Sequence, residues 1–175
     1  LAQRYKQELC DLIPEIDAVV GLGKNADVAA VVEQALNGAR VAEFGLPEEL
    51  IIEGDRALST PPHFAYIKIA EGCDNRCTYC AIPSIRGKFR SRPMEDVVAE
   101  AKDMDALGIK ELTLVAQDTT RYGKDLYGRY ALAELIRKIT EETSIPWIRV
   151  LYCYPDKITD ELIEEFKTNP RLLKY

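Results

Sequence analysis

Apolar residues in the second half of the chain follow two alternating spacings. Short apolar runs at 65–70, 111–116 and 147–152 have the length and composition of buried strands. Between these runs, apolar residues recur at intervals of three and four, as on the buried face of a helix. Strands that alternate with helices in this way predict right-handed βαβ units and a parallel sheet, and therefore an α/β fold.

Each helix expected in this half has a boundary signal or one apolar face. Pro93 stands at the start of the first helix and Gly108 just after its end. Thr159 precedes the third helix, where its side chain can cap the first amide groups. The apolar faces consist of Val97, Val98, Ala101, Met104 and Leu107 in the first helix, Leu132, Leu135, Ile136 and Ile139 in the second, and Leu162, Ile163 and Phe166 in the third.

Residues 1–44 predict a helix, a strand and a second helix. Gly21-x-Gly23, at the end of the strand expected within 16–23, lacks the third glycine of a nucleotide-binding loop, so we interpret it as a plain turn. Asn25 can cap the second helix, and Gly38 stands just past its end. The apolar faces are Tyr5, Leu9, Leu12 and Ile13 in the helix over 1–13, and Val28, Val31, Val32, Ala35 and Leu36 in the second helix.

The stretch 45–63 lacks a clear period and ends in two prolines, which favours a domain boundary. We therefore expect part of one α/β domain over 1–44, a linker over 45–63 and a second domain over 64–175. Three strand–helix units and the start of a fourth are too few for a closed eight-stranded barrel, so the second domain is predicted to be an incomplete (β/α) barrel. A start inside a helix and an end at an apparent strand predict that the sequence is a piece of a longer protein.

Composition excludes several classes of protein. Hydrophobic residues make up 47% of the chain and charged residues 30%, which is ordinary for a globular domain with a core. The net charge of −6 provides no general basic field for nucleic acid or an anionic membrane. No apolar run reaches the roughly 18 residues that a membrane-spanning helix needs. The five cysteines are an odd number, which favours reduced thiols and a cytoplasmic location over a disulfide framework.

Three of the cysteines stand together directly after the first strand of the second domain. Cys73, Cys77 and Cys80 have the spacing Cys-x3-Cys-x2-Cys. Thiolates this close on one loop suit an iron–sulfur cluster, and three of them leave one iron of a four-iron cluster open to another ligand. The aromatic ring of Tyr79 could pack against a nucleoside held nearby.

Two other interpretations of these thiols remain open. A structural zinc site would need a fourth ligand, and the available donors are Cys10, His63 and Cys153. The three thiols could also be uncoordinated. Cys10 and Cys153 are more simply explained as buried or pocket-lining thiols, because a free cysteine behaves as a small hydrophobic residue.

Three stretches of sequence resemble a known family. EGCDNRCTYCAIPSIRGKFRSRP (71–93) resembles the cysteine loop of the radical S-adenosylmethionine superfamily, and specifically of its methylthiotransferase branch. LVAQDTTRYGKDLYG (114–128) and RVLYCYPDKIT (149–159) are similar to the members that modify an aspartate of small-subunit ribosomal protein twelve. The sister group that modifies an adenosine in tRNA has an asparagine-rich segment where this chain has AQDTTRYG. The likeness runs nearly end to end and includes LAQRY at the start.

This resemblance implies a radical enzyme with a 4Fe-4S cluster on Cys73, Cys77 and Cys80. The open iron would bind S-adenosylmethionine, and the deoxyadenosyl radical released from it would take hydrogen from the β-carbon of the target aspartate before sulfur and methyl are added. Gln117 and Asp118 end the second strand, where the superfamily contacts S-adenosylmethionine. We name them, with Tyr79, as candidate cofactor-binding residues; for Gln117 and Asp118 the alternative is a turn capped by an Asp-Thr pair. No residue is assigned a catalytic role.

The resemblance also implies partners. They are the ribosomal protein substrate, an electron donor such as a flavodoxin, and a sulfur donor. From hydropathy and charge we expect no membrane partner, and nucleic acid is not expected to bind through this segment. In the family a second 4Fe-4S cluster is held by cysteines that would precede Leu1, so this segment alone is not expected to complete methylthiolation. The alternatives are a tRNA adenosine methylthiotransferase and, in another class, a non-catalytic zinc or iron–sulfur electron-transfer module.

Basic residues follow the cysteines. From Asn75 to Met94 the chain has no acidic residue, and Arg76, Arg86, Lys88, Arg90 and Arg92 could form a cationic rim that attracts an acidic substrate or an electron donor. The alternative is a solvated loop whose arginines pair with nearby carboxylates.

Overall fold

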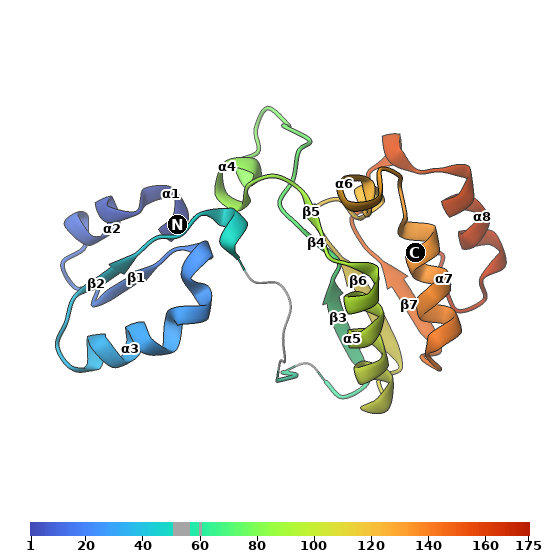
Figure 1. The fold of residues 1–175 in the computed structure, drawn as a ribbon, viewed down its shortest axis with the longest axis horizontal. Coiled ribbons are helices and arrows are strands. Elements are labelled where there is room, and N and C mark those ends of the chain that lie inside the picture. Colours follow the sequence, from blue (N-terminus) through green and yellow to red (C-terminus); the bar gives the residue numbers. More distant parts are fainter. Residues whose placement is uncertain (51–56, 60) are drawn as a thin grey trace. The chain divides into compact units, whose positions relative to one another are not determined.

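The computed structural model describes residues 1–50, 57–59 and 61–175 (Figure 1). Contacts divide these residues into two compact units: the first has residues 1–50 and 73–88, and the second has 57–59, 61–72 and 89–175. The linker expected over 45–63 lies partly outside the described residues, and the domain division stays a prediction. None of the helices in the described part of the chain combines the length and the apolarity that a bilayer crossing needs.

The second unit is built on a parallel sheet of three strands, in the order β3-β6-β7. The strands are β3 (Phe64–Lys68), β6 (Glu111–Val115) and β7 (Trp147–Val150). Their register places Ala65 beside Leu112 and Leu112 beside Ile148, and all three side chains are fully buried. The mixed α/β fold with parallel strands is therefore confirmed. Leu172 forms a further parallel bridge with Ile148, which agrees with a strand beginning at RLLKY.

Three helices also contribute buried side chains to this core. They are α5 (Met94–Ala106), α7 (Leu132–Glu142) and α8 (Asp160–Thr168), and Figure 1 shows α7 between α5 and α8, with which it makes contact. The predicted apolar faces of α5 and α7 are buried, except that Leu107 is 64% exposed because it stands beyond the last turn of α5. On α8, Leu162 is buried, whereas Ile163 is 40% exposed. Thr159 caps α8 as predicted, since its hydroxyl accepts a 3.2 Å hydrogen bond from Leu162 N–H.

Short elements occupy the connections of the second unit. β4 (Ala70–Glu71) and β5 (Arg90–Ser91) form an antiparallel pair. The connection after β6 contains η3 (Thr119–Arg121) and α6 (Lys124–Tyr127), and the one after β7 contains η4 (Pro155–Lys157).

The first unit has a parallel pair of short strands, β1 (Ala18–Val20) and β2 (Val41–Glu43). Its helices are α1 (Ala2–Tyr5), α2 (Gln7–Leu12), α3 (Val28–Leu36) and α4 (Ile82–Arg86), with 3-10 turns η1 (Leu22–Asp27) and η2 (Pro47–Glu49).

Two expectations for the first unit are wrong. The helix expected over 1–13 breaks at Lys6, whose φ of 45° ends α1 before α2 begins. Asn25 does not cap α3, because residues 22–27 form η1 and α3 starts after it. Gly38 does take the left-handed conformation expected past the end of α3, with φ of 86°.

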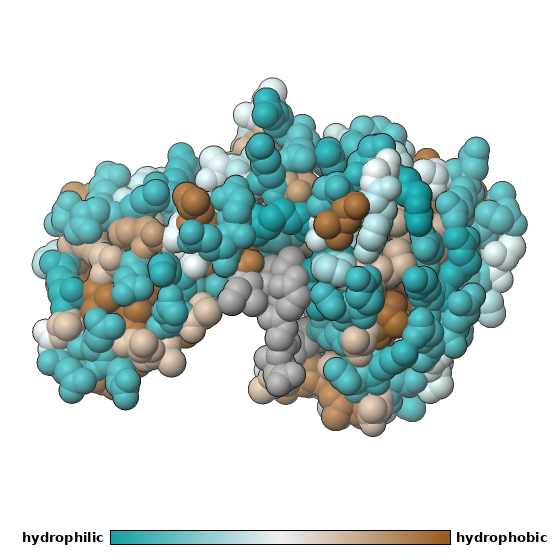
Figure 2. Space-filling view, viewed as in Figure 1, coloured by the Kyte–Doolittle hydropathy of each residue, from teal (hydrophilic) through white to brown (hydrophobic). Residues whose placement is uncertain are grey.

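The expected apolar faces of α2 and α3 are largely uncovered within the described residues. Cys10 and Val31 are buried, but Leu12 is 71% and Leu36 83% exposed. Figure 2 shows hydrophobic side chains on the surface of this unit.

Candidate functional site

The cysteine loop begins and ends at the β4–β5 pair. Glu71 lies opposite Arg90, and Ala70 opposite Ser91, so the chain leaves and returns at one point of the second unit. Gly72 turns the chain outward with φ of 73°, and its N–H donates a 2.9 Å hydrogen bond to Glu71 Oε1. The Glu71 carboxylate is fully buried and also accepts a 2.7 Å hydrogen bond from Lys68 Nζ. This charged pair fixes the start of the loop from inside the fold.

Backbone hydrogen bonds shape the loop itself. Cys73 N–H donates to Gly87 O at 3.2 Å, and Cys80 N–H donates to Cys77 O at 2.9 Å in a tight turn. Gly87 has φ of 75°, a left-handed conformation that favours glycine at this point. Within the loop, Cys73 is buried while Cys77 and Cys80 are half-buried, and all three are free thiols.

The three cysteines have the type of side chain that binds an iron–sulfur cluster, since such clusters take cysteine thiolates. In the described part of the chain, however, no three side chains of His, Cys, Asp or Glu lie close enough together to hold a metal ion. The structure therefore places Cys73, Cys77 and Cys80 on one short loop without gathering their sulfur atoms, and it completes no four-ligand zinc site among the described residues. The ring of Tyr79 is 90% exposed.

Gln117 and Asp118 lie at the carboxyl end of β6. Asp118 is fully buried and accepts a 2.5 Å hydrogen bond from Thr120 Oγ1. The Oε1 atom of Gln117 is buried and has no hydrogen-bond partner among the described residues. A buried amide oxygen without a donor is a place where a polar ligand group can bind, because leaving it unpaired costs free energy.

The loops after β6 and β7 meet at the same edge of the sheet. Thr119 Oγ1 donates to Leu151 O at 2.9 Å, and Thr120 Oγ1 donates to Tyr154 O at 3.3 Å. Cys153 Sγ lies 3.6 Å from Thr119 Oγ1. Burial raises the pKa of the Cys153 thiol, so this sulfur is held in its neutral form. The QDTT and CYPD segments therefore meet at one edge of the sheet, and the two threonines that join them were not singled out from the sequence.

The basic run does not form one continuous rim. Arg92 is only 4% exposed; its Nη1 atom lies 2.6 Å from Glu100 Oε2 and donates to Lys68 O at 2.9 Å. This arginine belongs to the interior of the second unit, because its charge is paired with a carboxylate of α5. Within the loop, Arg76 and Lys88 are exposed.

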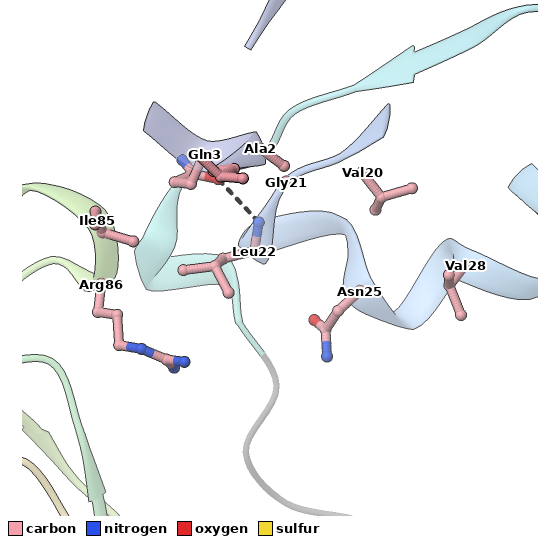
Figure 3. A pocket seen from close by; sticks show the side chains of 10 residues that line it. Ala2, Gln3, Val20, Gly21, Leu22, Asn25, Val28, Ile85 and Arg86 are labelled. Atoms are coloured by element: carbon pink, nitrogen blue, oxygen red, sulfur yellow. Dashed lines mark hydrogen bonds between the residues drawn. The ribbon is translucent and has the colours of Figure 1, made fainter. Parts of the chain in front are cut away.

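A hollow of about 450 Å³ in the first unit lies beside the Gly21–Gly23 turn (Figure 3). The side chain of Gln3 joins two loops there: its Oε1 accepts a 2.8 Å hydrogen bond from Leu22 N–H, and its Nε2 donates to Gly45 O at 3.0 Å. A Cβ at Gly23 would meet Leu46 O at 2.3 Å, so this glycine allows two backbone segments to approach. The turn joins β1 directly to η1, as expected for a structural turn.

Comparison with known proteins gives one family and a set of close relatives. Residues 67–173 match the sequence profile of the Radical SAM superfamily. The whole chain is 48% identical to "Ribosomal protein uS12 methylthiotransferase RimO" of Caldanaerobacter subterraneus, 51% identical to the protein of that name in Desulforamulus reducens, and 50% identical to that in Moorella thermoacetica. Each alignment covers 100% of this chain and 40% of the relative. The chain thus spans about 40% of the length of the curated relatives it matches.

Proposed function

The chain belongs to the radical SAM superfamily, and we propose that it is part of a methylthiotransferase that modifies an aspartate of ribosomal protein uS12. The identity of 48–51% to proteins named for that activity extends over the whole chain and supports this choice. The observation that carries the proposal is the loop with Cys73, Cys77 and Cys80 between β4 and β5, inside the stretch that matches the superfamily. We further propose that β3, β6 and β7 begin an incomplete (β/α) barrel and that residues 1–44 are part of a methylthiotransferase domain.

Two groups would be held by residues of this chain. Cys73, Cys77 and Cys80 would bind a 4Fe-4S cluster, and Gln117 and Asp118, at the carboxyl end of β6, would contact S-adenosylmethionine, with Tyr79 on the loop near its nucleoside. When bound, the cluster and S-adenosylmethionine supply a one-electron route to a C–H bond that acid–base chemistry cannot break. The buried Oε1 of Gln117 offers an acceptor for a donor group of this cofactor.

Neighbouring residues would protect that chemistry. Burial keeps the Cys153 thiol protonated, which lowers its power as a competing nucleophile or metal ligand. The hydrogen bonds from Thr119 and Thr120 to the loop after β7 hold Asp118 at a fixed point of the strand edge. We propose that the longer protein has a second cluster, an electron donor such as a flavodoxin and a separate sulfur donor, and that a ribosomal substrate places it in the cytoplasm.

The first test measures metal binding by this chain. After anaerobic reconstitution with iron and sulfide, we expect iron and sulfide uptake and the charge-transfer absorption of a cluster. Replacing Cys73, Cys77 and Cys80 by alanine should abolish both signals, whereas Cys10→Ala should leave them unchanged. Stoichiometric zinc binding with no iron uptake would contradict the proposed radical enzyme and favour a structural metal module.

The second test concerns the substrate. The longer protein that contains this chain is supplied with reductant, S-adenosylmethionine and either uS12 or tRNA, and the products are identified by mass spectrometry. We expect 5′-deoxyadenosine together with a methylthio group on an aspartate of uS12. A methylthiolated adenosine without a modified aspartate would contradict the proposal and favour a tRNA-modifying enzyme.

A further inference from the structure

The segment RYGKDLYG, residues 121–128, has no role in the proposed chemistry so far. It contains the short helix α6, with Gly123 at its start and Gly128 at its end in left-handed conformations, φ 81° and 70°. A Cβ at Gly123 would lie 2.5 Å from the Cβ of Ala131, so only glycine fits. The two glycines fold the segment into one compact turn.

This turn makes three hydrogen bonds with one serine of β5. The Asp125 carboxylate accepts from Ser91 N–H at 2.8 Å through Oδ2 and from the Ser91 hydroxyl at 2.6 Å through Oδ1. The Ser91 hydroxyl in turn accepts a 2.9 Å hydrogen bond from Gly123 N–H. Two of these bonds involve a carboxylate, which makes them stronger than bonds between neutral groups.

Two tyrosines of the same turn hold the residues just after β5. The Tyr122 hydroxyl, which is fully buried, donates to Arg92 O at 2.9 Å. The Tyr127 hydroxyl accepts a 2.9 Å hydrogen bond from Met94 N–H, the first amide of α5. The turn over 122–127 therefore binds the chain at residues 91, 92 and 94.

The bound stretch runs from Ser91 of β5, the strand by which the cysteine loop returns, to the first residue of α5. β5 pairs with β4 at only two residues on each side, and a ladder this short gives little stability on its own. Holding the ends of a long loop together costs conformational entropy that other contacts must offset. The hydrogen bonds from the 122–127 turn supply such contacts at the base of the loop.

We propose that residues 122–127 form a clamp that positions the cysteine loop, with Asp125 and Ser91 as its central positioning residues. The clamp fixes the chain where the loop ends and thereby limits how far the two ends of the loop can separate, next to Cys73. The consequence for cluster retention rests on the proposed function; the consequence for the thiols of the metal-free chain does not. The connection that contains the clamp begins at Gln117 and Asp118, so the cofactor-contacting residues and the clamp share one loop.

The first experiment measures the alkylation rate of each cysteine in the metal-free chain, resolved by mass spectrometry. We expect Ser91→Ala and Asp125→Ala to raise the rate at Cys73 by about tenfold, the factor that corresponds to losing one charge-assisted hydrogen bond. Ser91→Thr keeps the hydroxyl and should restore the slow rate. Cys10, which is 4% exposed, reports unfolding of the first unit and should keep its rate.

The chain offers a matched control. Asp105 accepts from Ser144 N–H at 2.6 Å and from the Ser144 hydroxyl at 2.7 Å, the same Asp-Ser arrangement away from the loop base. Ser144→Ala should leave the rate at Cys73 unchanged. An unchanged alkylation rate at Cys73 in Ser91→Ala would contradict the proposed clamp. An equal rise in rate at Cys73 and Cys10 would contradict it as well.

The second experiment follows iron release from the reconstituted chain to a chelator, together with the spectrum of the reduced cluster. Ser91→Ala and Asp125→Ala should release iron about tenfold faster than the parent chain and Ser144→Ala, in keeping with the same lost bond. Equal release rates would contradict positioning of the cluster by this clamp. If the parent chain takes up no iron, the proposed function fails, while the alkylation rates still decide whether the clamp holds the loop.

Discussion

Burial and one hydrogen bond act in opposite directions on the pKa of Cys153. Burial raises the pKa of its thiol above the usual range, and the hydrogen bond with Thr119 opposes this by lowering the pKa. Since the thiolate is the reactive form, the thiol should react slowly at neutral pH. The sulfur therefore behaves as a packed, inert group at the edge of the sheet, in agreement with the interpretation from sequence.

Thr119→Val tests how far the hydrogen bond with Thr119 lowers the pKa of Cys153. The substitution removes the contact that lowers the pKa of Cys153, so the midpoint of its alkylation rate against pH should move upward. In the parent chain that midpoint should already lie above that of a cysteine in an unfolded peptide, and the peptide serves as the reference in the same measurement. A midpoint that stays in place or falls in Thr119→Val would show that the hydrogen bond does not stabilise the thiolate.

At the scale of single elements, the start of α8 depends on one side chain. Thr159 is the N-cap, and its hydroxyl accepts from Leu162 N–H at 3.2 Å. Thr159→Ala should lower the free energy of unfolding by about 1 kcal/mol, because an N-terminal amide loses its partner. The shift is measured as a lower denaturant midpoint at unchanged slope. Thr159→Ser retains the hydroxyl and should stay close to the parent; a full loss in this variant would point to lost packing of the methyl group instead.

The end of α5 is joined to the segment before β7 by Asp105 and Ser144. The backbone N–H of Ser144 is the main cause that lowers the pKa of Asp105 in the folded chain. A carboxyl whose folded pKa is depressed contributes stability above its unfolded pKa of about 3.9, and this contribution is lost as pH falls through the folded pKa.

Asp105→Asn should therefore be less stable than the parent at neutral pH, and the difference should shrink as the pH falls below about 4. Urea unfolding at a series of pH values measures this difference. A gap that stays constant down to the acid end would mean that the interaction does not depend on the charge of Asp105.

The elements also show where sequence patterns suffice. In α7, Leu132, Leu135 and Ile136 recur at helical spacing and are all buried, because the sheet and the flanking helices cover that face. The same pattern in α3 does not predict burial: Val32 is 51% exposed, since no described element covers it. The break at Lys6 has neither glycine nor proline to mark it. Periodicity identifies an apolar face, but only the tertiary partner decides whether that face is buried.

In the candidate site, too, local sequence patterns do not predict the contacts between distant residues. The cysteine spacing is local and can be recognised directly, as can Gln117 and Asp118 at a strand end. The central contact of the clamp joins Asp125 to Ser91, which are 34 residues apart, so no local pattern predicts it. The burial of Arg92 depends on Glu100 and on the Lys68 carbonyl. Neither partner is marked in the basic run, so Arg92 was grouped with the residues of a cationic rim.

At the scale of the whole molecule, the two units differ in the size of their apolar cores. The buried cluster of the second unit includes Ile67, Leu114, Leu135 and Ile148 at 0% exposure and extends over the sheet and all three of its longer helices. In the first unit, the buried apolar residues outside the cysteine loop are Cys10, Val19, Val31 and Val41, among the residues that the structure describes. Because burial of apolar area is the main favourable term in folding, the second unit should be the more stable of the two.

Hydrogen exchange measured by mass spectrometry tests this difference directly. Amides of β3 and β6 should exchange only through global opening of the second unit, while those of β1 and β2 exchange at least about tenfold faster through local opening. The strands of the first unit are a suitable comparison, since each has only three residues and both pair in a parallel ladder. Urea should then remove protection from β1 and β2 at a lower concentration than from β6. Equal protection in the two units, lost at one urea concentration, would show that the small core of the first unit unfolds together with the large one and would contradict two separately stable units.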